Sequence, residues 1–156
     1  MTGPSAAHPF LWFEREAEEA ARFYVSLLPD SQITGIETQD GKPFIVSFTL
    51  SGIPYTALNG GPHYVLTPAF SFAVTCDGQA EVDRLWSALT EGGQALQCGW
   101  LTDRFGVTWQ IVPRQFFELR KAGTPAQTAA VMEAMMKMVK FDVAALEAAF
   151  EGAKGG

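Results

Sequence analysis

Polar and hydrophobic positions over the first part of the chain predict a strand, a helix and three further strands. The apolar run at 10–13 is short enough for a buried strand. Over 17–28, apolar residues recur every three or four positions, which is the spacing of an amphipathic helix. Strands are predicted at 32–38, 44–51 and 53–59, and the middle one alternates most regularly between apolar and polar residues.

The same order of elements begins again after a loop at 59–63. This loop contains Gly-Gly-Pro, which suits neither the interior of a helix nor that of a strand. A strand is predicted at 70–74, then a helix with apolar residues three or four apart up to Leu89, then a strand at 95–101 that leads into a hairpin. Strand, helix and several strands therefore occur twice, which predicts one domain with pseudo-twofold symmetry.

Beyond Pro113 the pattern changes to helix. Thr124 stands before Pro125, a common start of a helix because proline suits the first helical position. Asp142 is predicted to cap a last helix. Residues 1–8 are predicted to form a loose tail. The predicted organisation is a single domain over 1–156, with modules at 9–61 and 68–113 and C-terminal helices at 114–151.

Candidate chemistry is concentrated in the hairpin that follows Gln97. Its connection, Asp103 to Gly106, suits a tight turn, because aspartate can accept hydrogen bonds from the backbone that follows it and glycine accepts a positive φ. Trp109 and Gln110 then fall on opposite faces, since strand side chains alternate. No other segment of the sequence combines so many polar and aromatic side chains, so any site is expected to include this hairpin.

Composition and charge narrow the range of partners. Hydrophobic residues make up 47% of the 156 residues and charged residues 18%, the profile of a compact protein. The net charge of −6, from 17 acidic and 11 basic residues without a Lys/Arg cluster, disfavours nucleic acid and anionic membranes as partners. The apolar runs are too short to span a bilayer, and the N-terminus lacks the pattern of a signal peptide. We therefore expect no membrane partner and a cytoplasmic location, with Cys76 and Cys98 as free thiols.

Several stretches of the sequence carry a resemblance to a known family. They are Phe10–Phe13, Ala17–Tyr24, Ala57–Pro62, Val82–Trp86, Gln97–Trp100, Asp103–Gly106 and Trp109–Pro113, with Val131–Met135 in the tail. Together they resemble the PhnB-like group, often labelled 3-demethylubiquinone-9 3-methyltransferase, of the vicinal oxygen chelate superfamily. The resemblance extends from about Phe10 to Phe150. It implies the α+β glyoxalase/bleomycin-resistance/dihydroxybiphenyl dioxygenase fold, in which two paired βαβββ modules curl around a shared cavity, here followed by C-terminal helices.

The resemblance also implies where a metal would be bound. Metal-using relatives take His and Glu or Gln ligands from the first and last strands of each module. In this sequence those positions fall on Pro9, on Ala69 (or Pro68 if the register slips), on Gln110 and within 57–59. Proline and alanine side chains cannot bind a metal, and an amide oxygen is a weak ligand alone. His8 lies one residue from the first position, and such a shift turns a side chain to the other face of a strand. We therefore expect no catalytic metal and no cofactor.

Six side chains are candidates for contacting a ligand in the implied cavity. They are Asn59, His63, Cys98, Trp100, Trp109 and Gln110. Amides can bind a ligand by hydrogen bonds, a histidine can titrate near neutral pH, a thiol can act as a nucleophile, and indoles can stack on a flat group. Each also has a structural alternative: an amide satisfied within a turn or sheet, an exposed loop histidine, an inert thiol, or core aromatics. The sequence leaves both interpretations open.

Three functions fit these residues, and we prefer a metal-independent small-molecule protein. No paired general acid and base is evident, so whether it catalyses a reaction stays open. The second function is a metal-dependent lyase, isomerase or dioxygenase with unusual ligands such as His8, His63 and Gln110. The third is a pure binding or sequestering protein. The methyltransferase label is not supported, because the first strand-to-helix junction at 13–17 lacks a glycine-rich turn for S-adenosylmethionine.

Assembly is predicted from the helices that follow Pro113. Relatives of the implied fold commonly dimerise, and the methionine-rich segment 131–139 and Phe150 add apolar surface outside the two modules. The methionines are expected to pack against the sheet or against a second subunit. We therefore expect a homodimer.

Overall fold

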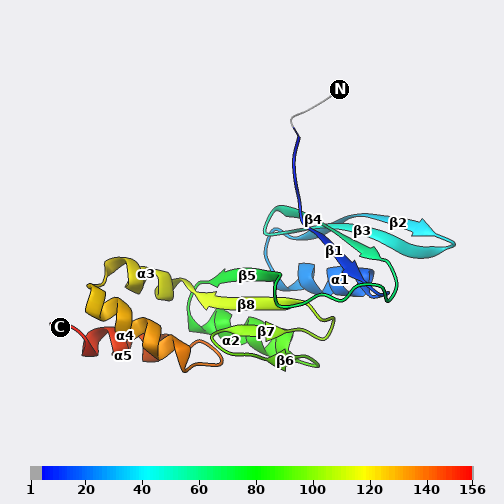
Figure 1. Cartoon of the computed structure of the whole chain (residues 1–156). Helices are drawn as coiled ribbons and strands as arrows, with labels where there is room; N and C mark the ends of the chain where they lie inside the picture. Colours follow the sequence, from blue (N-terminus) through cyan, green and yellow to red (C-terminus); the bar gives the residue numbers. More distant parts are fainter. Residues whose placement is uncertain (1–4, 156) are drawn as a thin grey trace. The chain divides into compact units, whose positions relative to one another are not determined.

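In the computed structural model, which describes residues 5–155, the chain divides into two units, of which the first ends at Leu66 and the second begins at Thr67. Part of the tail predicted at 1–8 lies outside the described residues. Within each unit, a helix packs against a four-stranded sheet (Figure 1). No helix between residues 5 and 155 combines the length and the apolar character needed to cross a membrane.

The first unit has the order strand, helix and three strands that the sequence predicts. Its elements are β1 (Phe10–Phe13), α1 (Ala17–Leu27), β2 (Gln32–Gln39), β3 (Lys42–Leu50) and β4 (Ile53–Asn59). The strands lie in the order β1-β4-β3-β2, with β1 parallel to β4 and the other pairs antiparallel. The first and last strands of the unit therefore lie side by side.

Small residues on α1 let this helix lie close to its sheet. Ala17, Ala20 and Ala21 are buried together with Tyr24. The sheet contributes one side-chain parity of β1, β3 and β4 to the same core, including Leu11, Phe13, Val46, Phe48 and Ala57. Along the strand predicted at 44–51, successive side chains therefore point in turn to the core and to the opposite face of the sheet.

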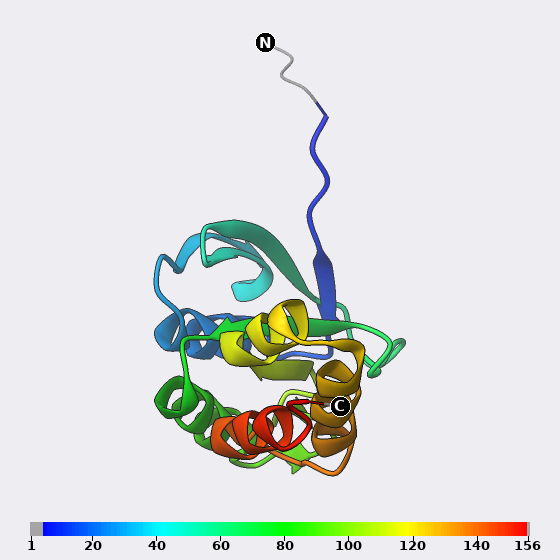
Figure 2. The same ribbon diagram turned by 90° about the vertical axis from the view of Figure 1, so that its left-hand side faces the viewer.

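The second unit repeats this order and adds three helices. Its elements are β5 (Ser71–Cys76), α2 (Gln79–Thr90), β6 (Gln94–Ala95), β7 (Trp100–Thr102), β8 (Thr108–Pro113), α3 (Arg114–Ala122), α4 (Pro125–Met136) and α5 (Val143–Gly152). The sheet order is β5-β8-β7-β6, and β5 is parallel to β8. The predicted α+β fold with two βαβββ modules is confirmed. Figure 2 looks onto the three C-terminal helices, coloured yellow to red, which lie together at one end of this unit.

The strand predicted at 95–101 is wrong in its middle part. The structure has the short strands β6 and β7 with a bend at 96–99 between them. Cys98 and Gly99 have φ values of 59° and 82°, which are incompatible with the extended backbone of a strand. The bend, not a continuous strand, therefore leads into the hairpin.

The connection between α4 and α5 holds this bend. The Cys98 N–H donates to the Met138 carbonyl at 2.8 Å, and the Gly99 N–H donates to the Val139 carbonyl at 2.7 Å. On the other side, the Gly99 carbonyl accepts from the Ile111 N–H of β8 at 2.8 Å. Because these partners are distant in sequence, local hydrophobic alternation gives no sign of the bend.

The caps predicted for the C-terminal helices are confirmed. Thr124 accepts from the Gln127 N–H while the Gln127 side chain accepts from the Thr124 N–H, so α4 begins with a capping box around Pro125. The Asp142 side chain accepts from the Ala145 N–H at 3.1 Å at the start of α5. α3 begins directly after Pro113 and has nine residues.

Candidate functional site

One face of the second sheet carries polar side chains from all four strands. Residues that are paired across neighbouring strands lie on the same face of a sheet. The register therefore places one set of side chains together, which we call the polar sheet face: Ser71, Gln94, Trp100, Thr102, Thr108 and Gln110. The residues of the other parity, such as Leu101, Trp109 and Ile111, are buried in the core of the unit, against which α2 packs.

Trp100 and Gln110 stand opposite each other on the polar sheet face. Both side chains are half-buried, and Gln110 Nε2 donates to Ser71 Oγ at 3.0 Å. The neighbouring strand β5 thus fixes the amide. Within residues 5–155 the Gln110 Oε1 atom accepts no hydrogen bond, so it is an acceptor available beside an indole ring.

Thr108 adds a second polar group to this face. It pairs with Ser71 on β5 and with Thr102 on β7, and only 1% of it is exposed. Its Oγ1 atom is buried without a hydrogen-bond partner in the described structure. Buried hydroxyl groups are normally hydrogen-bonded to protein or water, so an unsatisfied one requires an explanation.

Trp109 lies on the opposite side of the sheet, in the core of the second unit. It is 1% exposed, and its ring centroid lies 4.7 Å from that of Phe72. Its Nε1–H donates to Asp103 Oδ2 at 2.9 Å. The two tryptophans of the hairpin therefore have different surroundings, and only Trp100 shares a face with Gln110.

The Asp103 carboxylate organises the hairpin connection. It is 3% exposed, and its Oδ1 accepts from the N–H groups of Phe105 at 2.8 Å and Val107 at 3.0 Å. Gly106 has a φ of 87° and donates its N–H to the Asp103 carbonyl at 3.0 Å. The predicted turn chemistry is confirmed, and it fixes which side chains of β8 enter the core.

The two cysteines are free thiols, as predicted. Cys98 is half-buried in the bend before β7, with its Sγ 3.9 Å from the Met136 carbonyl oxygen. Cys76 is buried at the end of β5, and burial, together with the Glu81 carboxylate, raises the pKa of its thiol to about 11. Cys76 is therefore protonated at neutral pH and unreactive as a nucleophile there.

Asn59 connects elements of the first unit. Its Oδ1 accepts from the Ala17 N–H at 2.8 Å, and its Nδ2 donates to the Pro43 carbonyl at 3.0 Å. The N-cap residue of α1, Glu16, makes no side-chain capping bond, so Asn59 satisfies a helix N–H that would otherwise lack an acceptor. Both the oxygen and the nitrogen of the Asn59 amide are therefore used in hydrogen bonds within the first unit, which agrees with a structural role for this residue.

The histidines of the first unit have other partners than Asn59. His63 is exposed in the loop after β4, with its ring edge-on to Trp12 at a centroid distance of 6.5 Å, and Tyr64 contacts the same indole at 5.0 Å. His8 Nε2 lies 3.0 Å from Thr56 Oγ1. The candidates that the structure brings together on one face are therefore Trp100 and Gln110 alone among the six.

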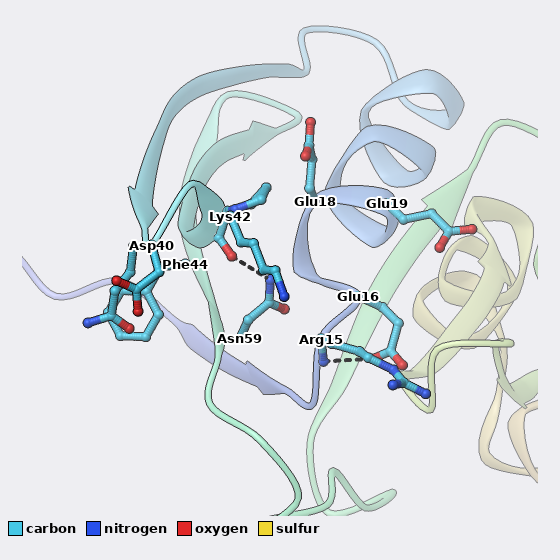
Figure 3. Close-up of a pocket in the computed structure, with 10 residues that line it drawn as sticks. Arg15, Glu16, Glu18, Glu19, Asp40, Lys42, Phe44 and Asn59 are labelled. Carbon is cyan, nitrogen blue, oxygen red and sulfur yellow. Dashed lines mark hydrogen bonds between the residues drawn. The ribbon is translucent and has the colours of Figure 1, made fainter.

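A pocket of about 700 Å³ lies between the start of α1 and the β2–β3 turn. Figure 3 shows side chains of the α1 start on one side and Asp40, Lys42, Phe44 and Asn59 across from them. Apart from Pro43, Phe44 and the amides Gln39 and Asn59, its lining is charged: Arg15, Glu16, Glu18, Glu19, Asp40 and Lys42. Ligand pockets are mostly apolar with a few polar groups, so this opening resembles a charged surface cleft more than a site for a small organic molecule.

A comparison with models of protein families identifies the family of this chain. The family model described as 3-demethylubiquinone-9 3-methyltransferase matches residues 5–112. The chain belongs to this family. The match ends at the last but one residue of β8, whereas the predicted resemblance extended to Phe150, so α3, α4 and α5 lie outside the part that the family model covers.

The solved structure of a PhnB protein agrees with this assignment. A Bacillus cereus protein described as a putative 3-demethylubiquinone-9 3-methyltransferase, PhnB protein, is 31% identical with a TM-score of 0.66, and the match covers 70% of this chain and 99% of that one. Protein PA1353 from Pseudomonas aeruginosa is 23% identical with a TM-score of 0.59 and coverages of 70% and 98%, which shows the fold alone. None of the curated proteins matches the chain. The predicted place in the PhnB-like group is confirmed.

The residues of this PhnB-like protein do not fit the cofactor that the family description implies. A methyltransferase needs a site for S-adenosylmethionine, commonly a glycine-rich turn between strand and helix. The β1–α1 junction is Glu14-Arg15-Glu16, where the Glu16 carboxylate accepts the Arg15 N–H at 3.2 Å. The β5–α2 junction has a single glycine, Gly78, after Asp77. Neither junction presents free backbone N–H groups on a run of glycines.

A metal centre does not fit the donor set either. Among residues 5–155, no group of three or more His, Cys, Asp or Glu side chains is placed to hold a metal ion. Pro9 and Ala69, which lie before β1 and β5, have no donor atom in their side chains. Gln110 already uses its Nε2 toward Ser71, which leaves one neutral oxygen. One amide oxygen is too weak a donor set for a divalent cation.

Ser71 and Thr108 belong to the polar sheet face, although the sequence pattern alone does not single them out. Strand periodicity gives part of the signal, because Thr108 has the parity of Gln110 and Ser71 alternates with the apolar residue Phe72. The pairing of β5 with β8 gives the other part, and it joins segments that lie far apart in the chain. Periodicity cannot predict such a pairing.

Proposed function

We propose that this PhnB-like protein binds a small uncharged molecule on the polar sheet face of its second unit, without a catalytic metal. The observation that carries this proposal is the juxtaposition of Trp100 with Gln110, whose amide is fixed by Ser71 while its Oε1 is left as an acceptor. A fixed amide beside an indole ring offers one directional hydrogen bond and one flat apolar surface.

The side chains of the polar sheet face indicate the chemical class of the ligand. No residue that the register places on this face of β5, β6, β7 and β8 carries a charge. A charged ligand would lose hydration there without gaining an opposite charge, so a neutral ligand is favoured. A hydrogen-bond donor on the ligand can reach Gln110 Oε1, and a planar group can stack on Trp100. Aromatic amides and phenols meet both conditions.

A screen of such compounds tests the proposal. We expect uncharged aromatic amides and phenols to raise the melting temperature of the protein, while matched carboxylates and amines do not. For the best binder, calorimetric titration should give an affinity about ten-fold weaker for Gln110→Ala, the size of one hydrogen bond of about 1.4 kcal/mol. Trp100→Ala should weaken binding further, because the stacking surface is lost.

The matched control is Gln39→Ala, which removes an exposed glutamine from β2 in the first unit. This variant should bind the same compound with unchanged affinity. If Gln110→Ala and Trp100→Ala also left the affinity unchanged, the ligand would not be on the polar sheet face. If only charged compounds bound, the proposed ligand class would be wrong.

The absence of a catalytic metal is the second part of the proposal and has its own test. Because proline, alanine and one amide oxygen stand at the implied ligand positions, protein purified without chelators should contain much less than one divalent ion per chain. Elemental analysis measures this directly. A stoichiometric metal that disappeared in the variant with His63 and Gln110 both changed to Ala would establish the metal-dependent alternative instead.

We propose binding, as opposed to acid-base catalysis, as the role of this face. A general acid or base must titrate and must lie within hydrogen-bond reach of the reacting proton. The polar sheet face offers amides, hydroxyl groups and an indole, none of which titrates near neutral pH. Mass spectrometry of each binder after prolonged incubation with the protein should return the compound unchanged. A cytoplasmic location, expected from the sequence, stays a prediction.

We further propose that the protein is a homodimer. Large apolar side chains of the C-terminal helices and of the connection after α4 are exposed, namely Phe117 (48%), Met136 (64%) and Val139 (42%). Burial of such side chains against a second copy would remove apolar surface from water. Light scattering at micromolar concentration should give about twice the chain mass of 16.9 kDa. A value near 16.9 kDa would contradict the proposal.

A further inference from the structure

The three C-terminal helices set this chain apart from the part of the family that the family model describes. The family model ends at residue 112, and 70% of this chain already covers 99% of the Bacillus cereus protein. Helices α3, α4 and α5 all follow that point. Any effect they have on the proposed ligand site must therefore act through contacts with β5–β8 or with the segments that connect these strands.

Such contacts exist at the bend that precedes β7. The carbonyl groups of Met138 and Val139, in the connection between α4 and α5, accept the N–H groups of Cys98 and Gly99. Cys98 has a φ of 59°, a conformation that non-glycine residues adopt only when their surroundings hold them in it. Trp100, the residue with the flat surface of the proposed site, follows directly.

Phe141 closes the bend from the side of the helices. A Cβ atom on Gly99 would overlap the Phe141 ring, so the ring lies directly against the glycine. Phe141 is 2% exposed and packs edge-on against Phe116 at a centroid distance of 5.2 Å, and its carbonyl accepts from Gln79 Nε2 at 2.9 Å. The ring is therefore packed against α3, and the backbone of Phe141 is bonded to α2. The other side of Gly99 is bonded to Ile111 of β8.

We propose that Phe141 is a positioning residue for Trp100. The Phe141 ring lies against Gly99, and carbonyl groups of the connection after α4 accept the N–H groups of the bend. On the other side, the Ile111 N–H of β8 donates to the Gly99 carbonyl. Together these contacts fix the angle at which the backbone enters β7. That angle sets Trp100 opposite Gln110. The C-terminal helices, absent from the family model, thereby fix the stacking surface of the proposed ligand site. The placement of Trp100 by Phe141 does not depend on the proposed function, whereas its effect on ligand binding rests on that function.

Fluorine NMR of protein labelled with 5-fluorotryptophan tests the geometry without any ligand. The chain has four tryptophans, and Trp100→Phe assigns one of the four resonances. In Phe141→Ala the Trp100 resonance should move or broaden, while that of Trp12 in the first unit stays in place. The amide protons of Cys98 and Gly99 should exchange about ten-fold faster, since their local protection depends on the held bend.

The control is Leu146→Ala. Leu146 is fully buried in α5, so its truncation also damages the packing of the C-terminal helices, although none of the hydrogen bonds described for the bend involves it. Because the hydrogen bonds of the bend are kept, the Trp100 resonance should be unchanged in this variant. Should Phe141→Ala fail to fold, Phe141→Leu keeps most of the volume and removes the flat ring. An unmoved Trp100 resonance in a folded Phe141 variant, or an equal movement in Leu146→Ala, would overturn the inference.

Amide hydrogen exchange and the fluorine chemical shifts together also distinguish between two roles of Phe141. Faster exchange at Cys98 and Gly99 with an unmoved Trp100 resonance would show a residue that supports the bend without positioning the indole, and the inference would fail. Failure of the proposed function looks different: the Trp100 resonance moves in Phe141→Ala, yet Trp100→Ala binds aromatic amides as the parent protein does. The two failures are therefore distinguishable.

Discussion

Asp103→Ala is expected to destabilise the protein by about 2–6 kcal/mol. The carboxylate is buried and accepts hydrogen bonds from the N–H groups of Val107 and Phe105 and from the Nε1–H of Trp109. Two of these donors belong to buried residues, and each loses this acceptor on truncation at a cost of about 1–3 kcal/mol. Urea denaturation followed by circular dichroism measures the change in the free energy of unfolding.

Asp77→Ala is the matched control for that measurement. Asp77 is also an aspartate at the end of a strand, with its carboxylate paired to Arg114, but 79% of its side chain is exposed. An exposed ion pair contributes little, so this change should stay within about 1 kcal/mol. Comparable losses for the two variants would mean that the buried bonds of Asp103 contribute no more than a surface ion pair.

Gly106→Val is expected to lower stability by about 1–3 kcal/mol and also to weaken binding to the polar sheet face. Gly106 has a φ of 87°, which a β-branched residue adopts only with strain. No heavy atom lies within 4 Å of a Cβ added there, so the cost comes from the backbone and not from a clash. Relief of this strain alters the start of β8, and a register slip by one residue would exchange Gln110 for Trp109 on the polar sheet face.

Gly41→Val separates the two effects of that substitution. Gly41 has a φ of 76° and the same open space around an added Cβ, but it belongs to the β2–β3 turn of the first unit. Both variants should lose similar stability in thermal unfolding, whereas calorimetry with an aromatic amide should show weaker binding, by about ten-fold, for Gly106→Val alone. Equal affinities at matched stability would mean that this hairpin does not shape the site.

Much of the fold could be predicted because it depends on short-range patterns. The alternation along 44–51 matches the burial of β3, and Thr124 and Asp142 cap their helices as expected from residue type and position. The turn at Asp103 to Gly106 followed from side-chain chemistry within four residues. In each case the sequence neighbours are also the interacting partners.

The errors occurred where the partner lies far along the chain. The bend at 96–99 depends on carbonyl groups of Met138 and Val139, which hydrophobic alternation cannot reveal. The candidate site shows the same limit: Gln110 and Trp100 were identified by type, while the bond that fixes the amide comes from Ser71 on β5. Trp109 shares the chemistry of Trp100 but not its face, and only the pairing of β7 with β8 decides between them.

The bond from Asn59 to the first turn of α1 has a consequence for the order of folding. The Ala17 N–H finds its acceptor 42 residues later in the chain, at the end of the last strand of the first unit. The helix can form its central turns early from local contacts, but its first turn is completed only when β4 pairs with β1. Completion of the first turn of α1 therefore depends on closure of that long loop, and local helix formation alone is not sufficient for it.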